Sequence, residues 1–291
     1  MATGKTISRV IRVMVVAAMA GSAVTLTAGS ASAAAGSVTK SGDQVIVNAG
    51  ARTGNDFKIS LSGNQVVIRD DHPMSVGGGC RAEIPGNTVF CPVNPNSDTV
   101  VVNAGDGDDT ITKTGSIRSE LNAGPGNDRI DGGPTTFADY LDGGAGNDSL
   151  NGGPNLDILT GGLGADTLSG GGGFDYVNYQ DSSSGVVVDL DNNADDGVSG
   201  EGDNALSNVE LIIGSKFGDR LTGSTGNNSL LGLAGNDVLT GGAGNDSLYG
   251  DTGNDTLEAR DNVSGNDTAD GGANTDTCRA DTSDAKNACE A

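Results

Sequence analysis

The sequence has few of the residues from which enzyme sites and large apolar cores are usually built. It contains no tryptophan, only 3% of its 291 residues are aromatic, and His72 is the single histidine. One histidine excludes zinc sites made from histidine pairs and leaves most acid–base schemes without a partner group. The H-E-x-x-H and G-x-S-x-G motifs are also absent. We therefore expect no catalytic residues and a protein that is not an enzyme.

Long hydrophobic runs are missing too. No stretch approaches the ~20 apolar residues that a membrane span requires. At the N-terminus Lys5, Arg9 and Arg12 precede a short apolar stretch, Val13 to Ala20, and the small residues Ala31-Ser32-Ala33 follow. This order is typical of a secretory signal peptide, residues 1–33, cleaved before Ala34. We expect a secreted, extracellular protein; an uncleaved helix that tethers the chain is the alternative.

Basic residues are scarce. The chain has 16 lysines and arginines but 39 acidic residues, which gives a net charge of −23. Without residues 1–33 the chain keeps 13 basic residues and all 39 acidic ones, a net charge of −26. Such a field repels nucleic acid and anionic membranes and attracts cations. Glycine, with 49 residues, is far above its usual ~7%. This composition indicates disorder unless a strict period organises the glycines.

The four cysteines form an even set, Cys80, Cys91, Cys278 and Cys289. In an exported protein such a set predicts disulfides, and three pairings are possible. We favour Cys80–Cys91 and Cys278–Cys289, which close two short loops of equal span. Zinc bound by thiolates is the less favoured interpretation, because the spacing is not C-x₂-C.

A nine-residue repeat organises most of the glycines. Typical copies are GGAGNDSLN from Gly143 and GGAGNDSLY from Gly241, that is, G-G-x-G-x-D-x-(apolar)-x. An apolar residue, such as Leu150 or Leu248, follows two places after each aspartate. The aspartates of the repeats, with Asn228 in the place of one of them, are Asp109, Asp128, Asp139, Asp148, Asp157, Asp166, Asp175, Asp219, Asp237, Asp246, Asp255, Asp267 and Asp276.

The pattern has a direct physical meaning. Glycines permit positive φ, so the first six residues can turn tightly, and the last three form a short strand with its apolar residue inward. Stacked parallel strands lie about 4.8 Å apart, and one ion with oxygen ligands at about 2.4 Å can bridge two stacked turns. Mg²⁺ binds at shorter distances, and oxygen ligands disfavour zinc and copper. Several Ca²⁺ ions are therefore the expected cofactor.

The repeats resemble the RTX, or hemolysin-type calcium-binding, nonapeptide repeats. With its predicted signal peptide and paired cysteines, this chain is similar to secreted actinobacterial members of that family. The resemblance implies an all-β, right-handed parallel β-roll, a β-solenoid with two nonapeptides per coil and Ca²⁺ between turns n and n+2. It makes the thirteen aspartates metal ligands, twelve of them in the pairs Asp128/Asp148, Asp139/Asp157, Asp148/Asp166, Asp157/Asp175, Asp219/Asp237, Asp237/Asp255, Asp246/Asp267 and Asp255/Asp276. A weak or empty calcium site is expected at Asn228. Copies of the repeat without the third glycine, such as residues 152–160, are also expected to be poor calcium sites.

These patterns divide the chain into consecutive regions. After the signal peptide we expect an N-terminal β-strand cap (34–103), a first roll (104–178), an irregular connecting coil (179–213), a second roll (214–281) and a disulfide-tied tail (282–291). A separate small β-domain is the alternative for residues 34–103. Cys278 takes the inward apolar position of the last repeat, so a bond to Cys289 would tie the tail over the open edge.

The function predicted from the sequence is that of a secreted calcium-binding protein whose ions are required for folding. Calcium is the predicted partner, together with a cell-envelope or extracellular polysaccharide. The alternative is a polysaccharide-binding or polysaccharide-modifying accessory module that uses the flat face of the roll. Only four tyrosines and five phenylalanines are available for the aromatic platforms such a module needs.

Overall fold

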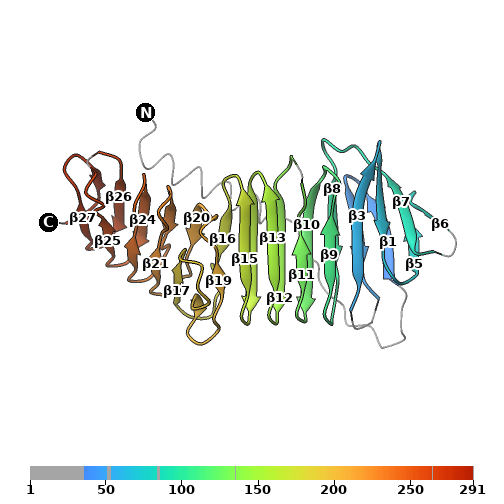
Figure 1. The fold of residues 1–291 in the computed structure, drawn as a ribbon, viewed down its shortest axis with the longest axis horizontal. Helices are drawn as coiled ribbons and strands as arrows, with labels where there is room; N and C mark the ends of the chain where they lie inside the picture. The colour runs from blue at the N-terminus through green and yellow to red at the C-terminus, as the bar shows by residue number, and fades with distance from the viewer. Residues whose placement is uncertain (1–35, 51–53, 84–85, 135, 264, 291) are drawn as a thin grey trace.

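The computed structural model describes residues 36–50, 54–83, 86–134, 136–263 and 265–290. Over these ranges the chain forms an elongated roll of β-strands without a helix (Figure 1). It follows that the described residues include no helix with the length and apolar character needed to cross a membrane. The predicted signal peptide, residues 1–33, lies outside the described ranges.

One sheet, sheet A, extends along the whole roll. Its 13 strands within the described residues lie in the order β28 (Ala285–Asn287), β26 (Thr268–Ala273), β24 (Ser247–Thr252), β22 (Ser229–Leu231), β20 (Leu211–Ile213), β16 (Tyr176–Asn178), β14 (Asp157–Leu163), β12 (Asp139–Ala145), β10 (Arg118–Pro125), β8 (Thr99–Asn103), β2 (Gln44–Asn48), β1 (Gly36–Ser41) and β5 (Met74–Gly77).

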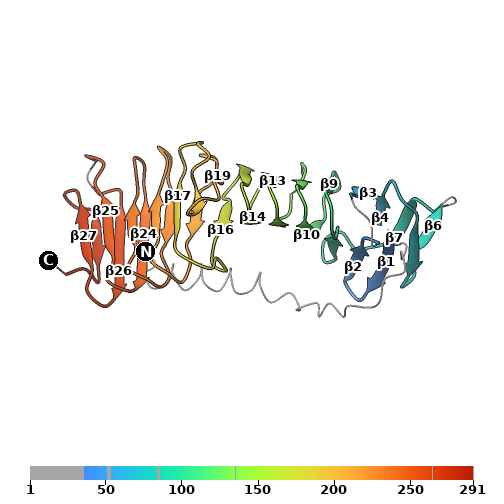
Figure 2. The same cartoon turned by 90° about the horizontal axis from the view of Figure 1, so that it is seen from below.

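Two shorter sheets form the other side of the roll (Figure 2). Sheet B has the order β19 (Asn204–Ala205), β15 (Thr167–Gly172), β13 (Ser149–Pro154), β11 (Arg129–Asp131), β9 (Thr110–Lys113), β3 (Asp56–Ser62), β4 (Gln65–Arg69), β7 (Thr88–Pro92) and β6 (Arg81–Glu83). Sheet C has the order β18 (Gly197–Val198), β17 (Val186–Asp189), β21 (Arg220–Thr222), β23 (Val238–Thr240), β25 (Thr256–Ala259) and β27 (Thr277–Ala280).

Two nonapeptides form one coil, because successive strands alternate between sheet A and the opposite sheet. In sheet A, β12 pairs in parallel with β14, and Leu141 lies opposite Leu159. In sheet B, β13 pairs in parallel with β15, and Leu150 lies opposite Leu168. Each of these pairs joins residues of successive coils. The β-solenoid of stacked parallel coils expected from the sequence is thereby confirmed.

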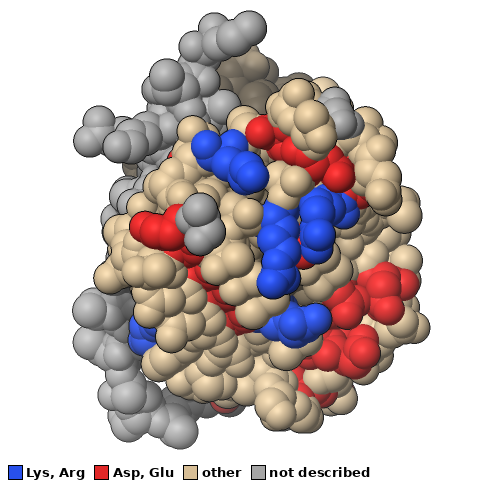
Figure 3. All heavy atoms as spheres, turned by 90° about the vertical axis from the view of Figure 1, so that its left-hand side faces the viewer, with Lys and Arg blue, Asp and Glu red and all other residues tan. Residues whose placement is uncertain are grey.

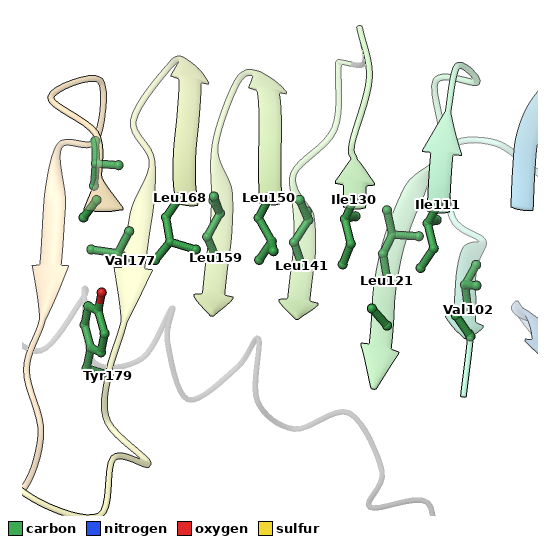
Figure 4. Close-up of a cluster of buried hydrophobic side chains, with 14 of the residues drawn as sticks. Val102, Ile111, Leu121, Ile130, Leu141, Leu150, Leu159, Leu168, Val177 and Tyr179 are labelled. Atoms are coloured by element: carbon green, nitrogen blue, oxygen red, sulfur yellow. The ribbon is translucent and has the colours of Figure 1, made fainter. Parts of the chain in front are cut away.

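The apolar residue of each repeat points into the roll. Leu141, Leu159 and Leu168 have no exposed surface, and neither do Leu221 and Leu239. Figure 4 shows the inward side chains of successive coils as one column from Val102 to Val177. This single column, rather than a broad globular core, fills the space between the two sheets, which explains how so few aromatic residues suffice.

The N-terminal region continues the two sheets as a β-rich cap. β2 pairs in parallel with β8 of sheet A, and β3 pairs in parallel with β9 of sheet B. Antiparallel partners then close this end, with β1 beside β2, and β4 between β3 and β7. A disulfide joins Cys80 to Cys91, as predicted.

The C-terminal end is held by the second predicted disulfide, Cys278–Cys289. Cys278 lies opposite Leu257 in the register of β27 with β25, which is the inward position expected for it. At this end of the roll several lysine and arginine side chains gather beside patches of aspartate and glutamate (Figure 3). In the last coils Glu258 forms ion pairs with Arg260 and Arg279.

The segment expected as an irregular coil, residues 179–213, is partly ordered into strands. β20 continues sheet A between β16 and β22. On the other side β19 ends sheet B, whereas β17 and β18 begin sheet C. Along this segment sheet C replaces sheet B on the side opposite sheet A, whereas sheet A continues without interruption.

Candidate metal centre

The thirteen predicted ligand aspartates lie in the turns, at or just before the start of a strand. All thirteen are at most 3% exposed. Burial of an aspartate requires compensation, because an ionised carboxylate that leaves water without partners carries a large free-energy penalty. The two oxygens of each side chain differ in the partners that the protein offers them.

One oxygen accepts a hydrogen bond from the backbone of the coil before it. The N–H of Asp128 donates to Oδ1 of Asp148 at 2.7 Å, and the N–H of Asp148 donates to Oδ1 of Asp166 at 2.8 Å. The same contact recurs on both sides of the structure and in both repeat regions, residues 104–178 and 214–281. It joins every predicted pair. We call the resulting series the aspartate ladders: Asn55–Asp109–Asp128–Asp148–Asp166–Asp203, Asp139–Asp157–Asp175–Glu210, Asp219–Asp237–Asp255–Asp276–Glu290 and Asn228–Asp246–Asp267.

The second oxygen, Oδ2, is buried in eleven of these aspartates and has no hydrogen-bond partner among the described residues. These eleven are Asp109, Asp128, Asp148, Asp157, Asp166, Asp175, Asp237, Asp246, Asp255, Asp267 and Asp276. A partnerless buried acceptor is uncommon in proteins, and a cation is one of its ordinary explanations. The repetition of one unpaired atom along the ladders therefore fits a row of metal ions.

The first glycine of each repeat leaves room beside this oxygen. A Cβ atom placed on Gly143 would lie 2.4 Å from Oδ2 of Asp148 and 2.6 Å from the carbonyl oxygen of Gly161 in the next coil. At Gly250 it would meet Asp255 and Gly271 at the same two distances. The space kept open by glycine is thus lined by carboxylate and carbonyl oxygens, the ligands that calcium prefers.

Burial also raises the pKa values of several ladder carboxyls. The pKa is about 7 for Asp148 and for Asp157, where loss of solvent is the largest cause and neighbouring carboxylates add to it. For Asp175 it is also about 7, from burial and the charge of Glu210. Without a cation the ladders therefore resist ionisation at neutral pH, and a bound cation would relieve this resistance.

Three ladder positions have donors that the sequence did not predict. Ser215 donates to both oxygens of Asp219, through its N–H at 2.6 Å and its Oγ at 2.8 Å. Ser224 donates in the same way to Oδ1 of Asn228, at 2.8 and 3.0 Å. Asp139 receives the ammonium of Lys113. Protein donors thus contact the side-chain oxygens at these three positions.

Residues 152–160, a copy without the third glycine, nevertheless keep the geometry of the others. Asn155 stands in the place of that glycine and adopts a φ of 83°. Asparagine tolerates the left-handed region better than most residues. Asp157 is consequently as buried as the other ladder aspartates and has the same unpaired Oδ2 within the described structure.

Sequence reasoning missed the ladder residues beyond the regular period. Asp203 accepts from the N–H of Asp166 at 2.9 Å although 37 residues separate them, and Glu210 accepts from the N–H of Asp175 at 2.8 Å. Both keep one part of the repeat, an acidic residue followed two places later by an inward apolar residue, Ala205 or Ile212. That part of the motif, read without the glycines, was the signal that could have found them.

Two acidic groups gather outside the ladders. Asp70, Asp71 and His72 place their ligand atoms within 4.8 Å of one another. Nδ1 of His72 lies 2.6 Å from Oδ1 of Asp71 but forms no hydrogen bond within the described structure. Asp189, Asp195 and Asp196 form the second group, in the segment between the two repeat regions.

Comparison with known proteins agrees with this geometry. The family model of the RTX calcium-binding nonapeptide repeat matches residues 119–134, 135–168, 142–177, 222–257 and 264–283. No curated protein matches the chain. The matched stretches contain most of the buried aspartates with an unpaired oxygen. The chain therefore carries the RTX calcium-binding nonapeptide repeats that its sequence predicted.

Proposed function

We propose that the chain is a secreted, non-enzymatic calcium-binding protein in which several Ca²⁺ ions lie between stacked turns and are required for folding. The observation that carries the proposal is the set of eleven buried Oδ2 atoms without partners among the described residues. Each belongs to an aspartate whose other oxygen is fixed by the backbone of the preceding coil. The carboxylates are therefore held rigidly toward the spaces that the first glycines leave open.

The proposed ligands are the Oδ2 atoms of these eleven aspartates together with glycine carbonyl oxygens of the stacked turns. Asp139 and Asp219, predicted as ligands from the sequence, are left out of this set, because protein donors already contact both of their oxygens. When bound, Ca²⁺ supplies the positive charge that the ladders otherwise lack. The protein contributes a preformed oxygen lining at each turn.

The energetics explain why the ions would be part of the fold. Stacked carboxylates repel each other, and glycine-rich turns lose much backbone entropy on folding. Each site adds about 2.7 kcal/mol of stability when calcium is in hundredfold excess over its dissociation constant. Neighbouring coils share contacts, so ordering should be cooperative, as in other solenoids.

Export is the second part of the proposal. The two disulfides are of the kind that persists outside the cytoplasm. They support the signal peptide predicted for residues 1–33. Detection of the processed chain in the culture medium, beginning at Ala34, would test this part separately.

A calcium titration of the purified chain tests the binding part. Calorimetry should give several ions per chain with positive cooperativity, and far-ultraviolet circular dichroism should show a gain of β structure between chelator and millimolar calcium. Mg²⁺ at the same concentration serves as the control and should produce only a small part of this spectral change. Identical spectra with chelator and with calcium would refute the proposal.

A further inference from the structure

Lys113 places an ammonium group among the carboxylates of the ladders. Its side chain, at the end of β9, has no exposed surface. The ammonium is 2.5 Å from Oδ1 and 2.7 Å from Oδ2 of Asp139, and it donates to the carbonyl oxygen of Ile117 at 2.9 Å. Both members of this ion pair are fully buried. Such a pair is retained only where the geometry satisfies both charges.

The sequence position of Lys113 explains how its ammonium reaches Asp139. In the register of β11 with β9, Asp131 lies opposite Thr112. The next residues, Gly132 and Lys113, therefore occupy equivalent places, and Gly132 is the first glycine of its repeat. At these glycines a side chain would point at the ladder carboxylate, as the short Cβ distances at Gly143 and Gly250 show. Lys113 thus extends from the glycine position into the space proposed for calcium.

The same turn has one carboxylate fewer than the others. Ser119 lies opposite Asp139 in the register of β10 with β12, so it stands where the repeat has aspartate. Its Oγ donates to Oδ1 of Asp139 at 2.9 Å. Two carboxylates suit a divalent ion, whereas a single carboxylate is neutralised by one ammonium. The two substitutions, lysine for glycine and serine for aspartate, therefore match each other in charge.

We propose that the Lys113 ammonium takes the place of a calcium ion at Asp139, so that this turn folds without metal. The inference rests on the proposed function, in which calcium fills the equivalent places of the other turns. It gives the roll one calcium-independent contact, between β10 and β12 of sheet A, near the N-terminal cap. The calcium-dependent coils then have a folded edge on which to stack before any ion is bound.

Ion counting on two variants of the full chain tests the replacement. Ser119→Asp adds the missing carboxylate but keeps the ammonium, whereas Lys113→Gly with Ser119→Asp restores both the first glycine and the aspartate of the repeat. Native mass spectrometry in calcium should find one more ion per chain in the double variant than in the wild type and no more in Ser119→Asp. An extra ion in Ser119→Asp, or none in the double variant, would overturn the inference.

Hydrogen exchange in the presence of chelator gives a second readout that does not require a new site to form. The amides of β10 and β12 should be protected in the wild-type chain and lose at least tenfold of that protection in Lys113→Met. Lys58→Met, which removes an exposed lysine of the cap, is the matched control and should keep it. Equal protection in Lys113→Met and the wild type would contradict the inference.

The two proposals fail in different ways. If no chain binds calcium, the proposed function is wrong. If the wild type binds calcium but exchange in β10 and β12 is fast under chelator, only the role of Lys113 is wrong.

Discussion

Each ladder aspartate uses its two oxygens for different purposes, and Asp148 illustrates the division. Oδ1 accepts the N–H of Asp128 at 2.7 Å. Oδ2 is buried and has no partner within the described ranges. A neutral amide would keep the first contact but would offer a weaker ligand and no charge. The residue is therefore a good place to separate the stacking of coils from metal binding.

We expect Asp148→Asn to remove one calcium site while the fold in calcium remains. The chain should bind fewer ions and lose about 2.7 kcal/mol of stability at a calcium concentration a hundred times the dissociation constant of the lost site. Calorimetric ion counting and urea unfolding at fixed calcium measure the two effects. Asp106→Asn, which changes an exposed aspartate near the same kind of turn, is the control. Equal losses in both variants would speak against a metal ligand at Asp148.

A methyl group at a first glycine should have a similar effect by filling the space. Gly143→Ala places its Cβ 2.4 Å from Oδ2 of Asp148, so we expect at least tenfold weaker calcium binding at this turn. Gly172→Ala is the matched control, because a Cβ there meets nothing within 4 Å. Site-resolved binding, followed by hydrogen exchange of β12 and β13 during a calcium titration, distinguishes the two. Unchanged protection in Gly143→Ala would show that the space is not used.

At the scale of strands, the repeats were predictable because one period fixes both the turn and the inward residue. In both repeat regions, residues 104–178 and 214–281, the aspartates and the apolar residues occupy the positions that the nine-residue period predicted. Glu210 and Asp203 were not predictable in this way, because their turns have lost the glycines and keep only an acidic residue before an inward apolar one. Lys113 was missed for the opposite reason, since a lone lysine in a strand is normally a solvent-exposed residue.

The last strands, β27 and β28, contain no fully buried residue, and the second disulfide ties them together. Cys278 continues the inward column in β27, and the bond to Cys289 holds β28 against β26. Replacing both cysteines with serine should lower the stability of this end by roughly 2–3 kcal/mol, as expected for a loop of this length. Hydrogen exchange should then become faster in β26 to β28 and stay unchanged in β10 to β14. Uniform destabilisation along the roll would contradict a local role for the bond.

For the whole molecule, the raised pKa values predict opposite pH dependences with and without calcium. The folded pKa of Asp148, Asp157 and Asp237 is about 7, above the ordinary value of 3.8. Without calcium, the folded state therefore binds more protons than the unfolded state between about pH 3.8 and 7. The stability of the folded state consequently falls as the pH rises toward 7. Chelated protein should accordingly gain β structure on acidification from pH 7.5 to about 5.

Calcium and protons compete for the same carboxyls, so the calcium affinity should decrease as the pH falls below 7. Calorimetry in buffers of different ionisation enthalpy should detect protons released on binding near pH 6.5. Calcium affinity that is constant from pH 7.5 to 5.5 would show that these carboxyls are not the ligands.

The ladder contact is the same whether 18, 20, 21 or 37 residues separate its partners, as in Asp148–Asp166, Asp128–Asp148, Asp246–Asp267 and Asp166–Asp203. Extra residues thus leave the roll at a corner and return without shifting the strands. One consequence is that the connection between β25 and β26 should accept a foreign peptide. Evolution could lengthen such corners independently, so that each becomes a recognition element on an otherwise uniform scaffold.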